Sequence, residues 1–211
     1  MIKNLLAAMM LLVTASAMAE PQAGIEYNQT QQLIPTENPA KIEVIELFWY
    51  GCPHCYAMET PINAWVKKLP KDVEFHRVPG VPRPDWAPMA KAFYTLETLG
   101  LTEKLHSQLF EAIHKQRALK PDDEAATVAW ITAQSGLDRK KVEEAFYSFS
   151  TNTKLTRAMQ LFRASGATGV PSLIIDGKYL TSSTLAGGNE ESLKVADYLI
   201  AKVRQEKTAK R

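Results

Sequence analysis

Apolar residues follow a strand-like pattern at the start of the chain and a helix-like pattern after it. The run Lys41 to Tyr50 (KIEVIELFWY) is rich in β-branched and aromatic residues, which is typical of a buried strand. A glycine ends this run. The next pattern predicts a helix over Cys52 to Lys68, with Pro53 in its first turn. A second strand is expected over Val73 to Val78, so the chain opens with a β-α-β unit.

From Asp85 the apolar residues recur at helical spacing, and glycines separate the segments. Five helices are predicted there: Ala87 to Leu99, Glu103 to Gln116, Asp123 to Gln134, Arg139 to Phe149 and Thr153 to Ser165. Each carries an apolar stripe of the kind that faces a protein core. This part of the chain therefore predicts an all-helical block.

Strand patterns return after Gly169-Val170-Pro171. Two short strands, Ser172 to Ile175 and Lys178 to Leu180, predict a hairpin. A final amphipathic helix is expected over Glu190 to Glu206, and a short strand is compatible with Ile25 to Tyr27. The outer segments should therefore form one sheet with helices, into which the helical block is inserted.

The first nineteen residues have the pattern of an export signal. Lys3 is a positive charge, Leu5 to Val13 is apolar, and Ala17-Met18-Ala19 is a small-x-small cleavage site. The apolar stretch is too short for a stable membrane-spanning helix, and an uncleaved anchor is the alternative. We expect cleavage after Ala19 and export to an oxidising compartment. The chain then divides into a discontinuous domain, residues 20–84 and 166–211, and an inserted domain, residues 85–165.

Composition and charge describe an ordinary globular protein. Of the 211 residues, 45% are hydrophobic and 23% are charged, which argues against a disordered chain. Removal of Lys3 with the signal lowers the formal net charge from +2 to +1. That balance gives no indication of a nucleic-acid partner or of binding to an acidic membrane surface.

The only two cysteines lie in Cys52-Pro53-His54-Cys55, where the first predicted helix begins. A thiolate at a helix N-terminus is stabilised by the helix dipole, so this spacing favours a reactive redox pair. A disulfide within four residues closes too short a loop to act as a strong staple. The alternatives are a pair of inert buried thiols and half of a zinc site. Zinc would need two more ligands from His76, His106 and His114, which lack paired ligand spacing.

The order of elements, with CxxC opening the first helix and Val-Pro preceding the third strand, resembles the thioredoxin superfamily. The inserted helices, the export signal and the Pro-His between the cysteines narrow this to the periplasmic thiol:disulfide oxidoreductases of the DsbA family. The segments FWYGCPHCY and ATGVPSLIIDGKY are both similar to segments of that family. The resemblance implies an α/β protein with a thioredoxin-like fold and an inserted all-helical domain, located in the periplasm.

The resemblance assigns roles to the residues of the CPHC motif. It implies that Cys52 is the exposed nucleophile and that Cys55 is its buried partner. Pro53 and His54 lie between them and would tune the pair. His54 would stabilise the Cys52 thiolate if its ring lies near the sulfur, and otherwise it is a solvated residue at the start of a helix.

Four further residues gain roles from the resemblance. Pro171 corresponds to a cis-proline that faces the dithiol, and Val170 before it would contact substrates. The alternative is a trans proline that opens a strand. Glu46 corresponds to a buried acid beneath the disulfide and would exchange a proton with Cys55; otherwise it is a solvated strand-edge residue, as we expect for Glu43. Glu59 corresponds to a second carboxylate, either a proton relay or a solvated helix residue.

The implied function is oxidation of protein dithiols without a metal or an external cofactor. The Cys52–Cys55 disulfide would pass to reduced, newly exported proteins through a mixed disulfide at Cys52, and a membrane partner resembling DsbB would then reoxidise the pair. We expect a monomer. The alternatives are a non-catalytic peptide-binding holdase that uses the groove beside Pro171, and a disulfide isomerase, which would normally carry an additional dimerisation domain.

Overall fold

The computed structural model describes residues 20–209, so the predicted export signal lies outside the described residues. One mixed sheet has the strand order β1-β5-β4-β2-β3. Its strands are β1 (Tyr27–Gln29), β2 (Ile42–Phe48), β3 (Val73–Pro79), β4 (Ser172–Ile175) and β5 (Tyr179–Ser182). β2 runs parallel to β3 and antiparallel to β4. Because β2 has a neighbour on each side, the residues that follow it are anchored at the interior of the sheet.

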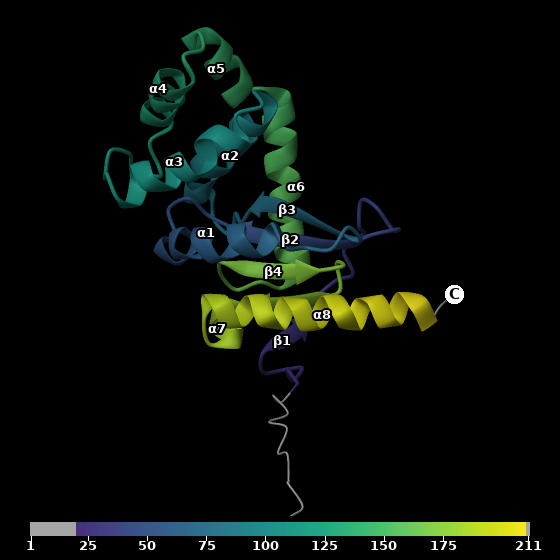
Figure 1. Ribbon diagram of the computed structural model, residues 1–211. Helices are drawn as coiled ribbons and strands as arrows, with labels where there is room; N and C mark the ends of the chain where they lie inside the picture. The colour runs from purple at the N-terminus through teal and green to yellow at the C-terminus, as the bar shows by residue number, and fades with distance from the viewer. Residues whose placement is uncertain (1–19, 210–211) are drawn as a thin grey trace, which may run out of the picture.

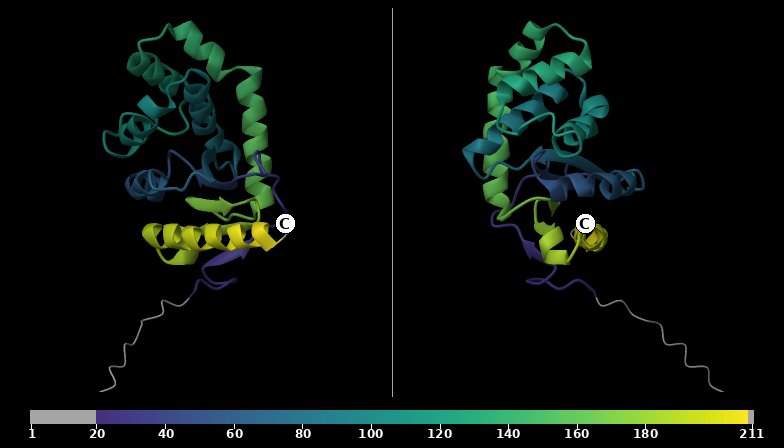
Figure 2. Two further views of the ribbon diagram at one scale, coloured as in Figure 1. Left: turned by 45° about the vertical axis from the view of Figure 1, so that its right-hand side comes forward. Right: turned by 90° about the vertical axis from the view of Figure 1, so that its left-hand side faces the viewer.

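The helices cover both faces of this sheet and extend beyond it. They are α1 (Pro53–Val66), α2 (Ala87–Thr98), α3 (Thr102–His114), α4 (Glu124–Ser135), α5 (Arg139–Phe146), α6 (Phe149–Ser165), α7 (Ser183–Ala186) and α8 (Asn189–Ala209), with a 3-10 turn η1 (Pro84–Trp86). Figures 1 and 2 show α2 to α5 as a separate group of helices and α6 running from that group down along the sheet. No helix within residues 20–209 combines the length and the apolar character needed to cross a membrane.

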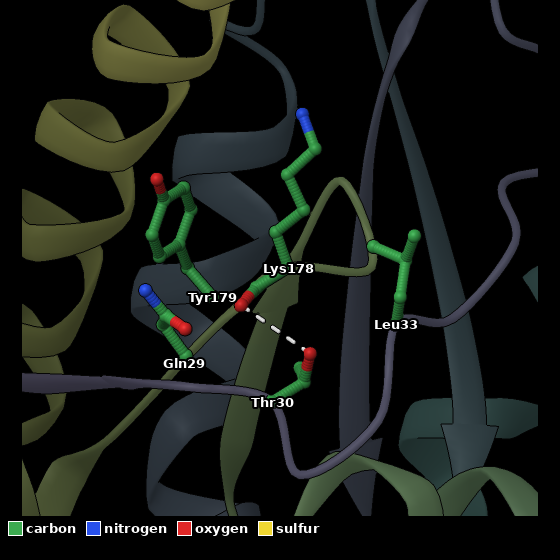
Figure 3. A pocket seen from close by; sticks show the side chains of 5 residues that line it. All are labelled: Gln29, Thr30, Leu33, Lys178 and Tyr179. Carbon is green, nitrogen blue, oxygen red and sulfur yellow. Dashed lines mark hydrogen bonds between the residues drawn. The ribbon is translucent and has the colours of Figure 1, made fainter.

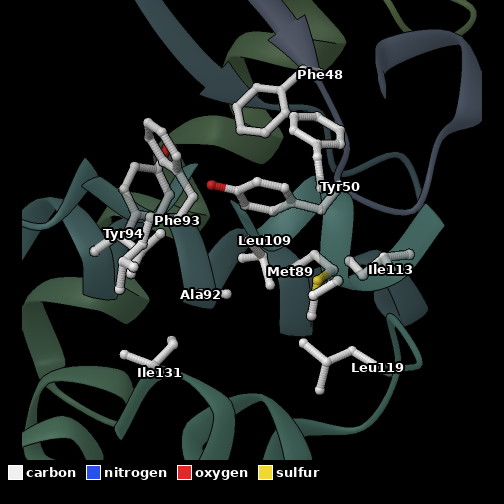
Figure 4. Packing of buried hydrophobic residues seen from close by; sticks show 14 of the residues in the cluster. Phe48, Tyr50, Met89, Ala92, Phe93, Tyr94, Leu109, Ile113, Leu119 and Ile131 are labelled. Carbon is white, nitrogen blue, oxygen red and sulfur yellow. The ribbon is translucent and has the colours of Figure 1, made fainter. Parts of the chain in front are cut away.

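Three clusters of buried apolar residues hold these layers together. One lies between the sheet and the helices α1 and α8, and includes Val44, Met58 and Leu199. A second lies on the opposite face of the sheet, where Phe162 of α6 packs. The third fills the helical block (Figure 4). It also includes Phe48 and Tyr50 of the segment before the motif, together with Cys52 and Cys55. The end of β2 and both cysteines are therefore packed against the inserted helices.

The expected order of elements and the fold class are confirmed, and the element boundaries differ from the predicted ones by up to four residues. The fourth helix of the block ends at Phe146, and α6 begins at Phe149 instead of Thr153. Ser148 caps α6, because its hydroxyl accepts the N–H of Thr151 at 3.0 Å. Phe149 is 87% exposed, so its apolar side chain did not mark a core-facing position. The short helix α7 was not predicted.

Candidate redox site

Cys52 lies at the junction between β2 and α1. It is the N-cap residue of α1, with extended backbone angles, and Pro53 follows in the first turn. The Cys52 sulfur accepts the backbone N–H of Cys55 at 3.4 Å. Both cysteines are free thiols. Cys55 is fully buried, as the resemblance implied, but Cys52, which was expected to be exposed, is only 8% exposed because it packs into the cluster of the helical block. This places the first sulfur at the positive end of the helix dipole and the second beneath it.

The surroundings move the pKa values of the two thiols in opposite directions. The pKa of Cys52 is lowered to about 6, chiefly by the hydrogen bond from the Cys55 side chain. Burial acts to raise this pKa. The N–H groups of Cys55 and His54 and the charge of His54 also lower it. Burial and the neighbouring Cys52 raise the pKa of Cys55 well above its usual value. At neutral pH the reduced pair therefore holds one thiolate, on Cys52.

The loop before β4 faces this sulfur. The Val170–Pro171 peptide bond is cis, as the resemblance implied. The Cys52 sulfur lies 3.5 Å from the carbonyl oxygen of Val170, which is 118 residues away in sequence. His54 is exposed at the start of α1, and its carbonyl oxygen accepts a hydrogen bond from the Asn189 side chain at 3.4 Å. The CPHC motif and the proline loop are thus adjacent in space.

A buried network of charged residues lies beneath the helix. Glu46 is 1% exposed, and Arg77 donates to it at 3.0 Å. The same guanidinium donates to Asn63 at 2.7 Å and lies 3.8 Å from Glu59. Burial raises the pKa of Glu46 to about 7 despite the opposing charge of Arg77. The charge of Glu46 in turn contributes to the raised pKa of Cys55, so this acid and this thiol influence each other.

The structure shows where two further carboxylates lie. Glu59, for which a solvated helix position was one of two alternatives, is buried and accepts hydrogen bonds from Ser107 and Asn63. Burial acts to raise the pKa of Glu59, but the hydrogen bond from His106, together with the charge of Arg77, lowers it below its usual value. The expectation that Glu43 is exposed was wrong: it is buried, because helices cover both faces of the sheet and leave β2 no solvent face. For the same reason Glu46 is not a solvated strand-edge residue.

Sequence reasoning did not find Arg77 or His106 as parts of this network. Arg77 stands opposite Glu46 in the parallel register of β2 and β3. An arginine within the strand pattern Val73 to Val78 was the available signal, but only the register shows which acid it meets. His106 comes from α3, and its ring lies 3.3 Å from Glu59. That contact depends on how α3 packs against α1, which no local pattern encodes.

The described residues contain no group of metal-ligand spacing that joins the zinc candidates to the cysteines. Within residues 20–209, the one group with the spacing of metal ligands is Glu37, Glu43 and His76, and it contains neither cysteine. His106 and His114 instead contact Tyr50, at 2.7 Å each. A separate pocket is lined by Gln29, Thr30, Leu33, Lys178 and Tyr179, where Thr30 donates to the carbonyl of Lys178 (Figure 3). None of the predicted site residues lines that pocket.

Comparison with known proteins connects this geometry to one family. The family described as "DSBA-like thioredoxin domain" matches residues 72–199. A thiol:disulfide interchange protein DsbA of Pseudomonas aeruginosa is 43% identical over 183 residues, covering 86% of this chain and 85% of the relative. The protein of the same description from Pseudomonas syringae pv. tomato is 41% identical over 202 residues, covering 95% and 92%.

Solved structures agree with these sequence relatives. The crystal structure of Pseudomonas aeruginosa DsbA superimposes with a TM-score of 0.82 at 42% identity, covering 90% of this chain and 97% of that one. The oxidoreductase DsbA from Xylella fastidiosa gives a TM-score of 0.81 at 26% identity, covering 89% and 100%. The likeness therefore extends over the sheet, the cysteine pair and the inserted helices together.

Proposed function

Because this chain belongs to the DSBA-like thioredoxin domain family and is a thiol:disulfide oxidoreductase, we propose that Cys52 and Cys55 are its reacting residues. In the oxidised protein, a substrate thiolate attacks the Cys52 sulfur, and the disulfide electrons leave on Cys55. A second substrate thiolate then attacks the substrate sulfur of the mixed disulfide, and Cys52 leaves as a thiolate. The substrate loses two electrons, and the protein ends as the dithiol.

The opposite pKa shifts of the two thiols are the observation that carries this proposal. A thiolate that is stable at neutral pH is a good leaving group, and Cys52 has a pKa of about 6. The raised pKa of Cys55 makes its thiolate unfavourable, so Cys55 takes up a proton as it leaves the disulfide. Glu46 supports that transfer, because its pKa of about 7 lets it release and recover a proton near neutral pH. Glu59 and Arg77 set the charge around Glu46.

We assign substrate contact to Val170 and Pro171. The Val170 carbonyl lies beside the Cys52 sulfur, where an extended substrate segment would arrive. Backbone groups at such a position pair with a peptide strand without reading its side chains, which suits an enzyme that acts on many clients. Pro53 and His54 complete the rim of the site, with the His54 N–H and charge favouring the thiolate.

We further propose that the mature protein acts in the periplasm as a monomer. The export signal in residues 1–19, with cleavage after Ala19, supports this location. Reduced, newly exported proteins are the expected substrates. A membrane oxidase resembling DsbB is the expected partner that restores the disulfide. The division into residues 20–84 with 166–211 and an inserted domain of residues 85–165 belongs to the same proposal.

A turnover assay tests the proposed function. Catalytic amounts of the oxidised protein are mixed with a reduced, unfolded two-cysteine protein and oxidised glutathione, and client disulfides are counted by mass after alkylation. We expect many client disulfides per molecule of enzyme, at a rate far above that of glutathione alone. A holdase would suppress client aggregation and leave the rate of disulfide formation unchanged, which would contradict the proposal.

The reduced protein should be alkylated selectively at Cys52 in mild acid. Because Cys52 has a pKa of about 6, its reaction with iodoacetamide should be half-maximal near that pH, whereas an ordinary thiol reacts slowly there. Peptide mapping should find the label on Cys52 and none on Cys55. Equal labelling of both cysteines, with a profile centred near pH 8.5 as for an ordinary thiol, would remove the basis for the assigned roles.

Glu46→Gln should remove the pH dependence that Glu46 gives to the rate of the step in which Cys55 reacts. In the Cys52–glutathione mixed disulfide, Cys55 passes its proton to Glu46, attacks Cys52, and releases glutathione as a thiolate. The wild-type rate should rise with an inflection near the Glu46 pKa of about 7. The variant should lack that inflection and react about tenfold or more slowly.

Glu43→Gln is the matched control for this measurement. Glu43 is a buried carboxyl group of the same strand, three residues away, and therefore on the opposite face of the sheet. We expect its pH–rate profile to keep the inflection. If Glu46→Gln keeps it as well, Glu46 does not exchange the proton.

A further inference from the structure

Two histidines of α3 contact Tyr50, which lies two residues before Cys52. The His106 Nδ1 atom lies 2.7 Å from the Tyr50 hydroxyl oxygen. The His114 Nε2 atom lies 2.7 Å from the Tyr50 carbonyl oxygen. One helix of the inserted block thus contacts both the side chain and the main chain of the residue that leads into Gly51 and Cys52.

The partners of His106 determine where its proton lies. Its Nε2 atom faces the Glu59 carboxylate at 3.3 Å, and a carboxylate only accepts, so Nε2 carries the hydrogen. Burial lowers the pKa of His106, which keeps the ring neutral and leaves Nδ1 as an acceptor. The Tyr50 hydroxyl therefore donates to Nδ1, and burial raises the pKa of Tyr50 so that the hydroxyl keeps its proton. Every polar atom in this line has a partner of the right kind.

The contact of His114 is equally directional. The Tyr50 carbonyl can only accept, so the Nε2 atom of His114 donates. The ring of His114 is held in place by stacking on Tyr56, with the ring centres 5.1 Å apart and the planes at 12°. Tyr56 belongs to α1, so this contact fixes α3 against the active-site helix as well as against the loop.

The residues around Tyr50 give the loop further support from the inserted block. Figure 4 shows the Tyr50 ring within the cluster of apolar side chains that includes Phe48 and Phe93. The neighbouring Trp49 stacks on Trp86, with ring centres 4.0 Å apart. The chain from Trp49 to Cys52 also closes a turn, in which the Cys52 N–H donates to the Trp49 carbonyl at 3.0 Å.

We propose that His106 and His114 are positioning residues of the exchange reaction, through which the inserted helices hold Tyr50 and thereby fix the Cys52 sulfur at the N-terminus of α1. The thiolate is stabilised by the hydrogen bond from Cys55 and by N–H groups of the first turn, so that stabilisation depends on where the loop places the sulfur. If the contacts between α3 and this loop are removed, the cysteines and α1 remain, but the Cys52 sulfur is no longer held in line with the N–H groups of the first turn. The inserted block is then part of the redox site and not only an addition to the fold.

The charged groups near these histidines come from several elements. Glu59 of α1, Arg77 of β3 and Glu103 of α3 all act on the titration of His106. Glu59 is the only one of the three within hydrogen-bond distance of its ring among the described residues. A role of His106 through Glu59 is therefore the alternative to a role through Tyr50, and the test must separate the two.

Substituting a histidine by Asn or by Gln tests its two ring nitrogens one at a time. An Asn side-chain amide lies near the position of Nδ1, and a Gln side-chain amide lies near that of Nε2. His106→Asn and His114→Gln preserve the bonds to Tyr50, whereas His106→Gln and His114→Asn remove them. The readout is the pH midpoint of Cys52 thiolate formation in the reduced, folded protein, followed by thiolate absorbance. A loss of global stability does not move this midpoint while the protein stays folded.

We expect a crossed pattern. His106→Asn and His114→Gln should keep the wild-type midpoint, while His106→Gln and His114→Asn should raise it by about half a unit to one unit. Tyr50→Phe, which removes only the hydroxyl, should match His106→Gln, and it carries the test of that contact if a His106 variant does not fold. The proposal is overturned if all of these variants keep the wild-type midpoint, or if His106→Asn shifts it and His106→Gln does not.

This inference rests on the proposed role of Cys52, and the two fail in different ways. If wild-type Cys52 titrates like an ordinary thiol, the proposed function loses its basis. If the wild-type midpoint is low and the variants show no crossed pattern, only the role of His106 and His114 is lost.

Discussion

Cys52→Ser should abolish disulfide transfer, whereas Cys55→Ser should still form mixed disulfides at Cys52 but no Cys52–Cys55 disulfide. The first variant lacks the sulfur that substrates attack. The second keeps the thiolate of low pKa at the helix N-terminus but has no internal disulfide to donate, so it forms an adduct only when oxidised glutathione first reacts with Cys52 and a client thiolate then displaces glutathione. In the turnover assay Cys52→Ser should fall to the rate of glutathione alone, and Cys55→Ser should be far slower than the wild type. With a client that has a single cysteine, non-reducing gels should show a long-lived adduct for Cys55→Ser only, because neither Cys55 nor a second client thiol is present to displace it.

The pair of variants is its own control, because the same substitution is made at two positions three residues apart. Adducts on Cys52→Ser through Cys55 would reverse the assigned order of attack. Substantial turnover by Cys52→Ser would mean that disulfide exchange does not pass through Cys52.

The reduced protein should gain stability with rising pH, and the oxidised protein should not show this gain. A thiol whose pKa is depressed in the folded state stabilises that state above the unfolded pKa and loses the effect as pH falls through the folded pKa. Cys52 has a folded pKa of about 6. Between about pH 5 and pH 8 the reduced form should therefore gain about 2 kcal/mol relative to the oxidised form, after allowance for solvent screening. Urea unfolding of both forms measures the difference.

Other titrating groups largely cancel in this comparison. Glu46 and the remaining carboxylates are present in both forms, and Cys55 stays protonated below pH 8 because burial raises its pKa. The oxidised form keeps the restriction that a disulfide places on the unfolded chain, but the closed loop is short and this restriction does not vary with pH. We expect the reduced form to be the more stable one at about pH 8. A stability difference that is the same at both ends of this range would exclude a stabilised Cys52 thiolate.

The sequence predicted the elements that form this site better than the contacts among them. The strand Lys41 to Tyr50 and the helix after Gly51 follow from local pattern and place Cys52 at a helix N-terminus. The cis geometry at Pro171 came from family resemblance alone, since general preferences favour trans. Its position opposite Cys52 is a tertiary fact, because β4 pairs with β2 across more than a hundred intervening residues.

The sequence did not place residues whose surroundings come from distant segments. Glu43 was expected at the surface because strand residues commonly alternate between core and solvent, but β2 is central and covered on both faces. The local sequence around Glu59 is that of an ordinary helix residue. Its buried position follows from contacts with His106 and Ser107, which belong to α3. The sequence suggests His106 and His114 only as candidate zinc ligands, whereas in the structure both contact Tyr50.

The redox equilibrium with glutathione tests most directly whether Cys52 and Cys55 form an oxidising pair. The protein is equilibrated at pH 7 in roughly 1 mM each of reduced and oxidised glutathione, quenched with acid, alkylated and weighed by mass spectrometry. If the Cys52 thiolate stabilises the reduced form, most molecules should carry two free thiols even though oxidised glutathione is abundant. A protein that is almost entirely in the disulfide form under these conditions would be a reductant or would hold a structural disulfide, and either result would contradict an oxidising role for Cys52 and Cys55.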